Sequence, residues 1–393
     1  MVAPLEGLLV LDFTRLLPGP FATQLLADLG ADVIKVEDPG PGDYMRSVPP
    51  TVQGVSYPFL MVNRGKRSIA VDLKTPEGQE VLRRLASRAD VLVEQFRPGV
   101  MASFRGDYET LAKVNPRLVY VSFSGFGQTG PAKDVPGHDI NFEALAGILG
   151  VTEGRDGRPV IPGVPIADLA SAFNAAFAIL AALRTRDLTG RGEQVDVSIF
   201  DTAVALMVLN LAHYLASGTE PRAGETILTG TFPFYNVYET ADGRWLAVAA
   251  VEPKFWARLC EVLGLPDRSE VQFADEATNA ETTRALAERF RSRTLKEWTA
   301  LLAHEDLPVS PVVHVSELVK DPHVGARGLL PTVDIPGLWK TRVIGHPAKH
   351  SVAEVREPAR VPTKGEDSDE VLASLGYPRE AIEDLWRRGI IAR

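Results

Sequence analysis

The first 125 residues alternate short apolar runs with helix signals, and this alternation is the strongest constraint on the fold. Apolar runs typical of buried strands occupy residues 8–12, 32–36, 68–72, 91–94 and 118–123. Helices are expected between them, at residues 22–29, 76–86 and 108–114. Strands that alternate with helices build a parallel sheet covered on both faces. The sequence therefore predicts an α/β fold with a Rossmann-like domain.

The remainder of the chain predicts a second, smaller α/β domain. An apolar helix at 169–183, a strand at 194–198 and one long helix at 199–216 complete the large domain, which we place at residues 1–216. The polar, glycine-containing stretch 217–231 is the predicted linker, and a hairpin followed by helices forms the predicted small domain, 232–329. Residues 330–393 are expected to return to the large domain. The Gly- and Pro-rich stretch 38–50 should contain neither helix nor strand.

Charge and cysteine usage exclude several classes of function. The formal net charge of −9 argues against a nucleic-acid partner, because phosphate binding requires a basic face. The single cysteine, Cys260, excludes an intramolecular disulfide and a cysteine-cluster metal site. The N-terminus lacks the pattern of a signal peptide, and no apolar run reaches about 18 residues without a polar interruption. We therefore predict a cytoplasmic enzyme without a membrane partner.

A glycine motif follows the fifth predicted strand. Gly125-Phe-Gly127-Gln-Thr-Gly130 matches G-x-G-x-x-G, the pattern of dinucleotide-binding loops. Pro131 follows at once, however, and no helix opens on the third glycine to hold a pyrophosphate. The motif also lies after the fifth strand rather than the first. A tight turn, or a loop over a different ligand, is the better interpretation.

Two titratable residues stand at predicted helix starts thirty positions apart. His138 precedes the helix signal that begins at Asp139, and the positive end of a helix dipole favours the neutral, basic form of an imidazole. Asp168 opens the apolar helix at 169–183. An Asp in such a place commonly caps its helix, so neither residue alone establishes a catalytic site.

Several motifs together resemble the family III CoA-transferase superfamily. They include Ser122-Phe-Ser-Gly-Phe-Gly-Gln-Thr-Gly-Pro131 and Thr189-Gly-Arg-Gly-Glu-Gln-Val-Asp-Val-Ser198, and the likeness extends over segments 28–37, 63–74, 97–100 and 321–328. The resemblance implies an acyl-CoA substrate, no metal or redox cofactor, and an interlocked homodimer. In that arrangement the active site forms between the large domain of one subunit and the small domain of the other.

The superfamily contains transferases and racemases, and the motif around His138 is similar to that of the alpha-methylacyl-CoA racemase subgroup. That subgroup carries Gly-His-Asp-Ile-Asn-Tyr, which residues 137–142 reproduce except at Phe142. Val251-Glu-Pro-Lys-Phe255 matches the stretch whose Glu supports the histidine. The resemblance thus implies that His138 and Asp168 exchange acid and base roles across an enolate, with Glu252 orienting the imidazole. Glu252 also suits a plain helix start.

The resemblance further implies a set of CoA contacts: Val71, Asp72, Leu73, Lys74, Glu94, Arg97, Gly137, Asp139, Ile140, Asn141 and Phe142. This chain differs from the racemase subgroup at Asp38, where that subgroup has Arg, and at 171–173, where it has a Gly-Gly pair. Two alternatives stay open. One is a CoA-transferase that forms an adduct on Asp168, and the other is a CoA-binding homologue without turnover.

Overall fold

The computed structural model describes the chain except residues 1, 155, 336, 338 and 357–359. Contacts between residues divide it into two compact units, which are described separately. Unit 1 comprises residues 1–148, 162–207 and 323–393, and unit 2 comprises 149–161 and 208–322. Unit 2 therefore contains the predicted linker 217–231 and most of the predicted small domain.

Unit 1 is built on a seven-stranded sheet in the order β14-β5-β2-β1-β6-β7-β8. Six strands are parallel, and only β14 pairs antiparallel, with β5. The strand order reverses between β1 and β6, and in such sheets ligands bind outside the carboxyl ends at this point. The Rossmann-like prediction is confirmed. The strands are β1 (Leu9–Phe13), β2 (Asp32–Glu37), β5 (Arg67–Val71), β6 (Val91–Glu94), β7 (Val119–Ser124), β8 (Gln194–Ser198) and β14 (Ile391–Ala392).

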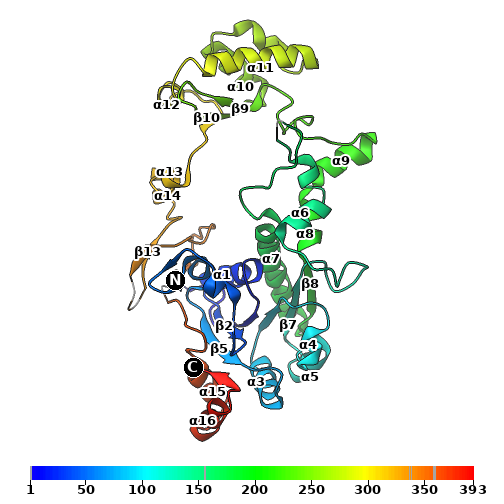
Figure 1. Cartoon of the computed structure of the whole chain (residues 1–393), viewed down its shortest axis with the longest axis vertical. Helices are drawn as coiled ribbons and strands as arrows, with labels where there is room; N and C mark the ends of the chain where they lie inside the picture. The colour runs from blue at the N-terminus through cyan, green and yellow to red at the C-terminus, as the bar shows by residue number, and fades with distance from the viewer. Residues whose placement is uncertain (1, 155, 336, 338, 357–359) are drawn as a thin grey trace. The chain divides into compact units, whose positions relative to one another are not determined.

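Successive side chains of a strand point to opposite sides of the sheet, so both faces need to be covered. Helices cover both faces of this sheet. On one face α1 (Pro18–Asp28) and α7 (Ile166–Thr189) pack against each other and against the strands. On the other face Leu11 and Phe13 join the main apolar core. That core also includes side chains of α3 (Pro76–Ala86), α5 (Tyr108–Val114), α15 (Ser368–Ser374) and α16 (Arg379–Arg387). Figure 1 shows the two C-terminal helices beside β5.

Local sequence accounts for most helix boundaries and for two departures from prediction. Thr75 caps α3 as expected, accepting the Gly78 N–H at 3.0 Å. The stretch 38–50 is not free of helix, because Asp43 accepts the Met45 N–H at 2.9 Å and starts η1 (Tyr44–Ser47). The predicted single helix 199–216 was also wrong. It is two helices, α8 (Ile199–Leu206) and α9 (Val208–Ser217), separated at Met207, where this segment of unit 1 ends.

Shorter elements complete unit 1. They are β3 (Thr51–Val52), β4 (Val55–Ser56), α2 (Tyr57–Asn63), α4 (Val100–Ser103), α6 (Asp139–Leu145), α14 (Pro322–Ala326, whose first residue falls in unit 2), β12 (Thr332–Asp334) and β13 (Lys340–Arg342).

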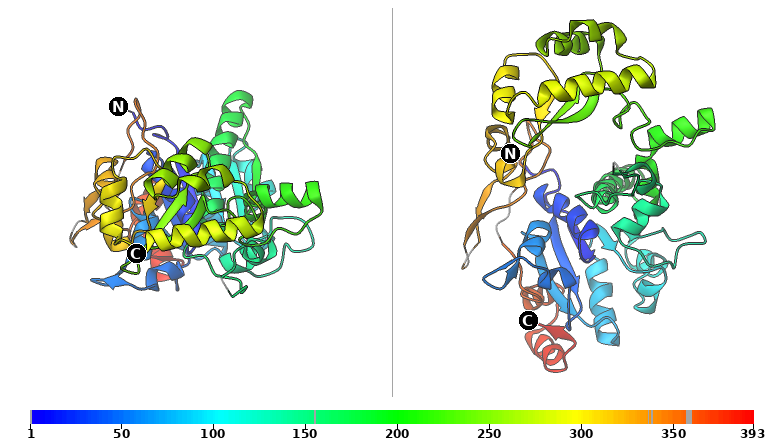
Figure 2. Two further views of the ribbon diagram at one scale, coloured as in Figure 1. Left: turned by 90° about the horizontal axis from the view of Figure 1, so that it is seen from above. Right: turned by 45° about the horizontal axis from the view of Figure 1, so that its top comes forward.

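Unit 2 contains a three-stranded antiparallel sheet, β11 (Val309–Pro311), β10 (Trp245–Ala249) and β9 (Tyr235–Glu239). The predicted hairpin is confirmed, since Trp245 pairs with Glu239 across the turn. The aromatic side chains of Phe234, Trp256, Phe290 and Trp298 are buried in its core. Figure 2 shows α11 lying across this sheet. The helical elements are η2 (Leu149–Val151), α9, α10 (Pro253–Val262), η3 (Pro266–Val271), α11 (Glu276–Phe290), α12 (Leu295–Leu302) and α13 (Val315–Leu318).

Within the described part of the chain, one helix has the length and apolar composition of a membrane span. It is α7, and the bent pair of α8 and α9 passes the same test when taken together. In unit 1, α7 packs against α1, β7 and β8. Its apolar side chains are thus partly buried beside the sheet, whereas others, such as Phe177 and Leu188, are exposed.

Candidate active site

A cavity of about 500 Å³ opens at the carboxyl ends of β6 and β7 in unit 1. Residues that directly follow β6 form one wall, among them Gln95, Phe96 and Arg97. Since the strand order reverses beside β6, this is where the fold is expected to hold a ligand. The remaining lining residues are Pro98, Ser124, Gly125, Lys133, Val135, Pro136, Gly137, His138, Asn141, Phe142 and Ile199.

His138 is the N-cap residue of α6, as predicted, and it lines this cavity. The Asn141 side chain accepts the His138 N–H at 3.0 Å, and the Asn141 N–H returns to the His138 carbonyl at 2.8 Å. Phe142 is buried against Phe126, with ring centroids 5.2 Å apart. A Cβ at Gly137 would lie 2.9 Å from the Phe142 ring. These contacts therefore fix the backbone before and after His138.

Asp168 lies in the first turn of α7, three residues after the N-cap Pro165. Its N–H donates to the Asp139 carboxylate at 3.0 Å, and the Ile166 N–H donates to Glu143 at 3.1 Å. Asp139 directly follows His138 in sequence, so these bonds bring the two helix starts together. Asp168 itself is not among the residues that line the cavity.

The carboxyl group of Asp168 is held in an environment that opposes its ionisation. Burial, followed by the charges of Asp139 and Glu143, raises the pKa of Asp168 to about 7. Acid–base catalysis is most effective when the pKa of the catalytic group is near the working pH. The Asp168 carboxyl group is therefore suited to gaining and losing a proton near neutrality.

This environment predicts a pH-dependent stability effect for Asp168→Asn. Near pH 4, Asp168 is protonated in the folded chain and only about half ionised in the unfolded chain, so the substitution should change little. As the pH rises towards 7, only the unfolded chain ionises, and the folded protein loses stability. Asparagine removes this loss, so we expect the free energy of unfolding to rise by about 1–3 kcal/mol at pH 8. Denaturant unfolding at pH 4 and pH 8 checks this, and equal effects at both values would contradict it.

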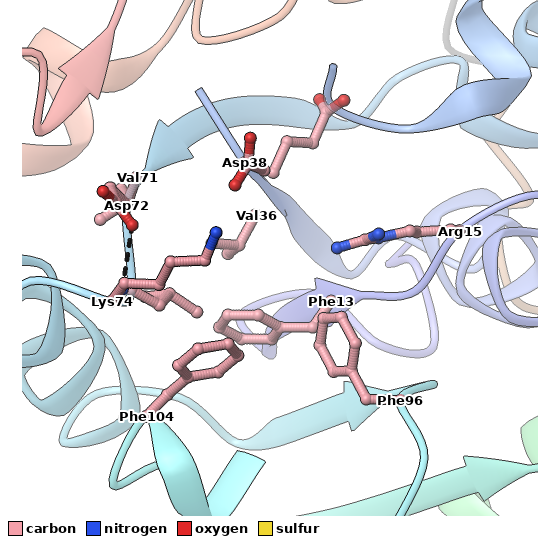
Figure 3. Close-up of a pocket in the computed structure, with 11 residues that line it drawn as sticks. Phe13, Arg15, Val36, Asp38, Val71, Asp72, Lys74, Phe96 and Phe104 are labelled. Carbon is pink, nitrogen blue, oxygen red and sulfur yellow. Dashed lines mark hydrogen bonds between the residues drawn. The ribbon is translucent and has the colours of Figure 1, made fainter. Parts of the chain in front are cut away.

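A second, smaller cavity of about 40 Å³ lies at the carboxyl ends of β1, β2 and β5 (Figure 3). It is lined by Phe13, Arg15, Val36, Glu37, Asp38, Val71, Asp72, Leu73, Lys74, Phe96 and Phe104. Four residues predicted from the resemblance thus gather here, the consecutive residues 71–74. Phe96 lines both cavities, so the two are neighbours along one edge of the sheet.

Aromatic rings and cations meet in this smaller cavity. The Arg15 guanidinium lies 5.0 Å from the centre of the Phe96 ring, and Phe96 packs edge-on against Phe104. Figure 3 shows the side chains of Arg15 and Lys74 extending from opposite sides, with Asp38 nearby. Rings of this kind can stack on a planar base, and guanidinium or ammonium groups can bind phosphate. The side chains around this cavity therefore include groups that can contact the base or the phosphates of a larger ligand.

The other predicted CoA contacts have different places. Arg97, Gly137, Asn141 and Phe142 line the larger cavity. Glu94 is buried and accepts the Phe96 N–H at 2.8 Å, while burial raises the pKa of its carboxyl group to about 7. The Glu94 carboxyl group therefore fixes the conformation of the turn that follows β6. Asp139 and Ile140 line neither cavity: Asp139 caps α7, and Ile140 is exposed.

Several lining residues were missed by the sequence analysis. Arg15 comes two residues after β1, and Gln95 and Phe96 follow β6 directly. The rule that ligands bind at the carboxyl ends of parallel strands could have identified these three. Phe104 and Lys133 come from loops and short helices with no comparable signal.

Glu252 belongs to unit 2, where it is the N-cap residue of α10. Its carbonyl accepts the N–H groups of Phe255 at 2.9 Å and Trp256 at 3.0 Å. The side chain makes no capping hydrogen bond and the residue is exposed. Its carboxylate is thus free of any role in capping α10.

The chain is similar along nearly its whole length to enzymes that act on CoA thioesters. Succinyl-CoA:glutarate CoA-transferase of Mus musculus is 35% identical over 395 residues, covering 99% of this chain and 90% of the relative. Alpha-methylacyl-CoA racemase of Homo sapiens is 36% identical, covering 97% and 96%. A crystal structure of a CAIB/BAIF family protein from Brucella suis is 33% identical, with a TM-score of 0.84 over 95% of this chain and 100% of that one. Residues 5–368 match CoA-transferase family III, and the chain belongs to this family.

Proposed function

We propose that this protein racemises or epimerises the 2-carbon of 2-methylacyl-CoA thioesters by a 1,1-proton transfer. The observation that carries the proposal is the pairing of two helix starts. His138 lines the large cavity, and Asp168 is bonded through its N–H to the adjacent Asp139. A carboxyl group with a pKa near 7 and an imidazole are both able to act as acid or base at neutral pH.

The chemistry uses the acidity that a thioester gives to its neighbouring carbon. One residue takes the 2-proton, and the electron pair moves onto the thioester oxygen to form a planar enolate. The other residue then donates its proton to the opposite face, which restores the thioester with inverted configuration. His138 and Asp168 exchange roles according to the hand of the substrate. Each positioned acid or base contributes roughly 10²–10⁴-fold. The thioester supplies the activation, so the proposed reaction includes no metal or redox cofactor.

The two neighbouring cavities support a placement for CoA. The adenine nucleotide would lie against the mouth of the smaller cavity, near the aromatic rings and Lys74. The pantetheine arm would pass Phe96 and Arg97 into the larger cavity and bring the thioester to His138. This path follows the edge of the sheet where the strand order reverses.

We also propose a homodimer, in which Glu252 of one subunit orients His138 of the other, and a cytoplasmic location. Exposed apolar side chains support association. In unit 1 they include Phe177 and Leu188 of α7, and in unit 2 they include Leu209 and Leu215 of α9. Large apolar side chains that are exposed in a single chain can become buried when two chains associate.

Exchange with solvent deuterium tests the proposed reaction. A single enantiomer of a 2-methylacyl-CoA, incubated with the protein in D₂O and without any acceptor acid, should gain deuterium at the 2-carbon and become racemic. Mass spectrometry and chiral chromatography of the released acid measure the two changes. If a panel of linear, sterol-like and aromatic 2-methylacyl-CoA thioesters shows neither change, the proposal is wrong.

A CoA-transferase reaction is the second candidate, and the named transferase relatives favour it. Asp168 would then attack the thioester carbonyl and form a covalent adduct that hydroxylamine or borohydride traps. This role requires the ionised carboxylate, which a carboxyl group with a pKa of about 7 supplies in about half of the molecules at neutral pH. Transfer of CoA to an added carboxylic acid, with no deuterium at the 2-carbon, would support the transferase over the racemase. A homologue that only binds CoA would give neither result.

A further inference from the structure

Helix α7 begins with a residue whose side chain cannot cap it. The N-cap is Pro165, which carries no side-chain acceptor, and the first N–H groups of a helix need acceptors from elsewhere. Two carboxyl groups of α6 supply them. Glu143 accepts the Ile166 N–H at 3.1 Å, and Asp139 accepts the Asp168 N–H at 3.0 Å. Because Asp139 and Glu143 are four residues apart, both project from one face of α6.

Glu143 is fully buried, with 0% of its surface exposed, although it lies only one turn beyond the cavity residue His138. Burial, followed by the proximity of the Asp139 carboxyl group, raises the pKa of the Glu143 carboxyl group. Glu143 Oε1 accepts the Ile166 N–H, whereas Glu143 Oε2 is buried and has no hydrogen-bond partner among the described residues. The start of α7 therefore rests on two acidic side chains, one of which is buried with an unpaired oxygen.

We propose that Glu143 is a positioning residue for Asp168: by accepting the Ile166 N–H it fixes the first turn of α7, and it places a second acidic side chain near the Asp168 carboxyl group. The inference rests on the proposed racemase function, in which Asp168 must donate a proton to one hand of the substrate. Glu143 lines neither cavity, so it acts through Asp168 and α7 rather than on the substrate.

Other acidic groups on the elements packed against α7 are engaged elsewhere or exposed. Asp28 of α1 pairs with Arg64, with 2.8 Å between the charged atoms. Asp196 of β8 accepts the Gln128 N–H at 2.8 Å. Asp201, in the first turn of α8, is exposed. The two groups that raise the pKa of Asp168 are those of Asp139 and Glu143.

The test compares Glu143→Gln with the unaltered protein. Glutamine keeps an oxygen for the Ile166 N–H but cannot ionise. Titration of ¹³Cγ-labelled aspartates, with the Asp168 signal assigned from Asp168→Asn, should show the Asp168 midpoint about one pH unit lower. In the deuterium-exchange assay, the limb of the pH profile that depends on protonated Asp168 should move by the same amount, with KM for acyl-CoA unchanged. Glu109→Gln, an exposed first-turn glutamate of α5, is the matched control and should change neither.

A second variant separates capping from charge. Glu143→Leu removes the acceptor as well as the charge, so we expect it to lower kcat further than Glu143→Gln. Asp139→Asn should also lower the Asp168 midpoint, since it removes the other charge. An unchanged Asp168 midpoint in Glu143→Gln overturns the inference. Absence of deuterium exchange in the unaltered protein would instead overturn the proposed reaction, because the carboxyl titration needs no substrate.

Discussion

His138→Ala should lower the rate of 2-proton removal from one enantiomer of the substrate by roughly 10²–10⁴-fold, with a much smaller effect on the other. The asymmetry follows from the two-base arrangement. The enantiomer whose proton faces the imidazole loses its base, whereas the opposite enantiomer still meets Asp168. In D₂O the latter should therefore exchange its proton with solvent and keep its configuration. Asp168→Ala should give the mirror-image result. Separate exchange measurements on the two enantiomers, by mass spectrometry, check both variants.

The control for this prediction is His304→Ala, since His304 is exposed in unit 2 and should leave both rates unchanged. Equal losses for both enantiomers in His138→Ala would contradict the two-base assignment. If the protein is a transferase, the two measurements should differ from these results. Asp168→Ala would abolish CoA transfer, and no variant would show deuterium at the 2-carbon.

Most of the fold follows from patterns that act over a few residues. The strand at Val91–Glu94 and the helix at Tyr108–Val114 were predicted with their observed bounds, because apolar burial and turn residues fix them locally. The break at Met207 was missed, since residues 199–216 are mostly apolar and carry neither Gly nor Pro inside the helix signal. The strand β14 was also missed. This strand has only two residues, which is too short to show an apolar periodicity in the sequence. Its pairing with β5 depends on the return of the C-terminal helices to unit 1.

The candidate site was predictable where it rests on contiguous motifs. His138 at the start of α6 follows from Pro136-Gly137 and the apolar run after it. The sequence could not predict which residues hold the first turn of α7, and with it Asp168, in place. Pro165 at the N-cap transfers the capping role to residues more than twenty positions earlier, and only the packing of α6 on α7 shows this. The aromatic walls of the smaller cavity are likewise a product of strand order, which brings β1 beside β6.

The largest stability effect is expected at Asp12, a fully buried carboxylate on β1. It accepts hydrogen bonds from the Thr14 N–H at 2.9 Å and the Thr23 hydroxyl at 2.8 Å, and it pairs with Lys66 at 2.9 Å. Burial alone would raise its pKa, but Lys66 and Lys35 hold the pKa of Asp12 below its usual range. Asp12→Ala leaves the buried Lys66 ammonium without its counter-charge. We expect the free energy of unfolding to fall by about 3–5 kcal/mol, measured by guanidinium denaturation at pH 7.

Asp32→Ala is the matched control, because Asp32 lies on the neighbouring strand β2 and pairs with Arg67 at the surface. Its side chain is 49% exposed, so water can replace the lost partner and the expected cost is below about 1 kcal/mol. Similar losses in the two variants would mean that the buried pair contributes no more than a surface one. Asp12 immediately precedes Phe13 and is three residues from Arg15, so its loss should also displace the walls of the smaller cavity. Weaker CoA binding by Asp12→Ala under conditions where it is folded would connect this buried charge to the ligand site.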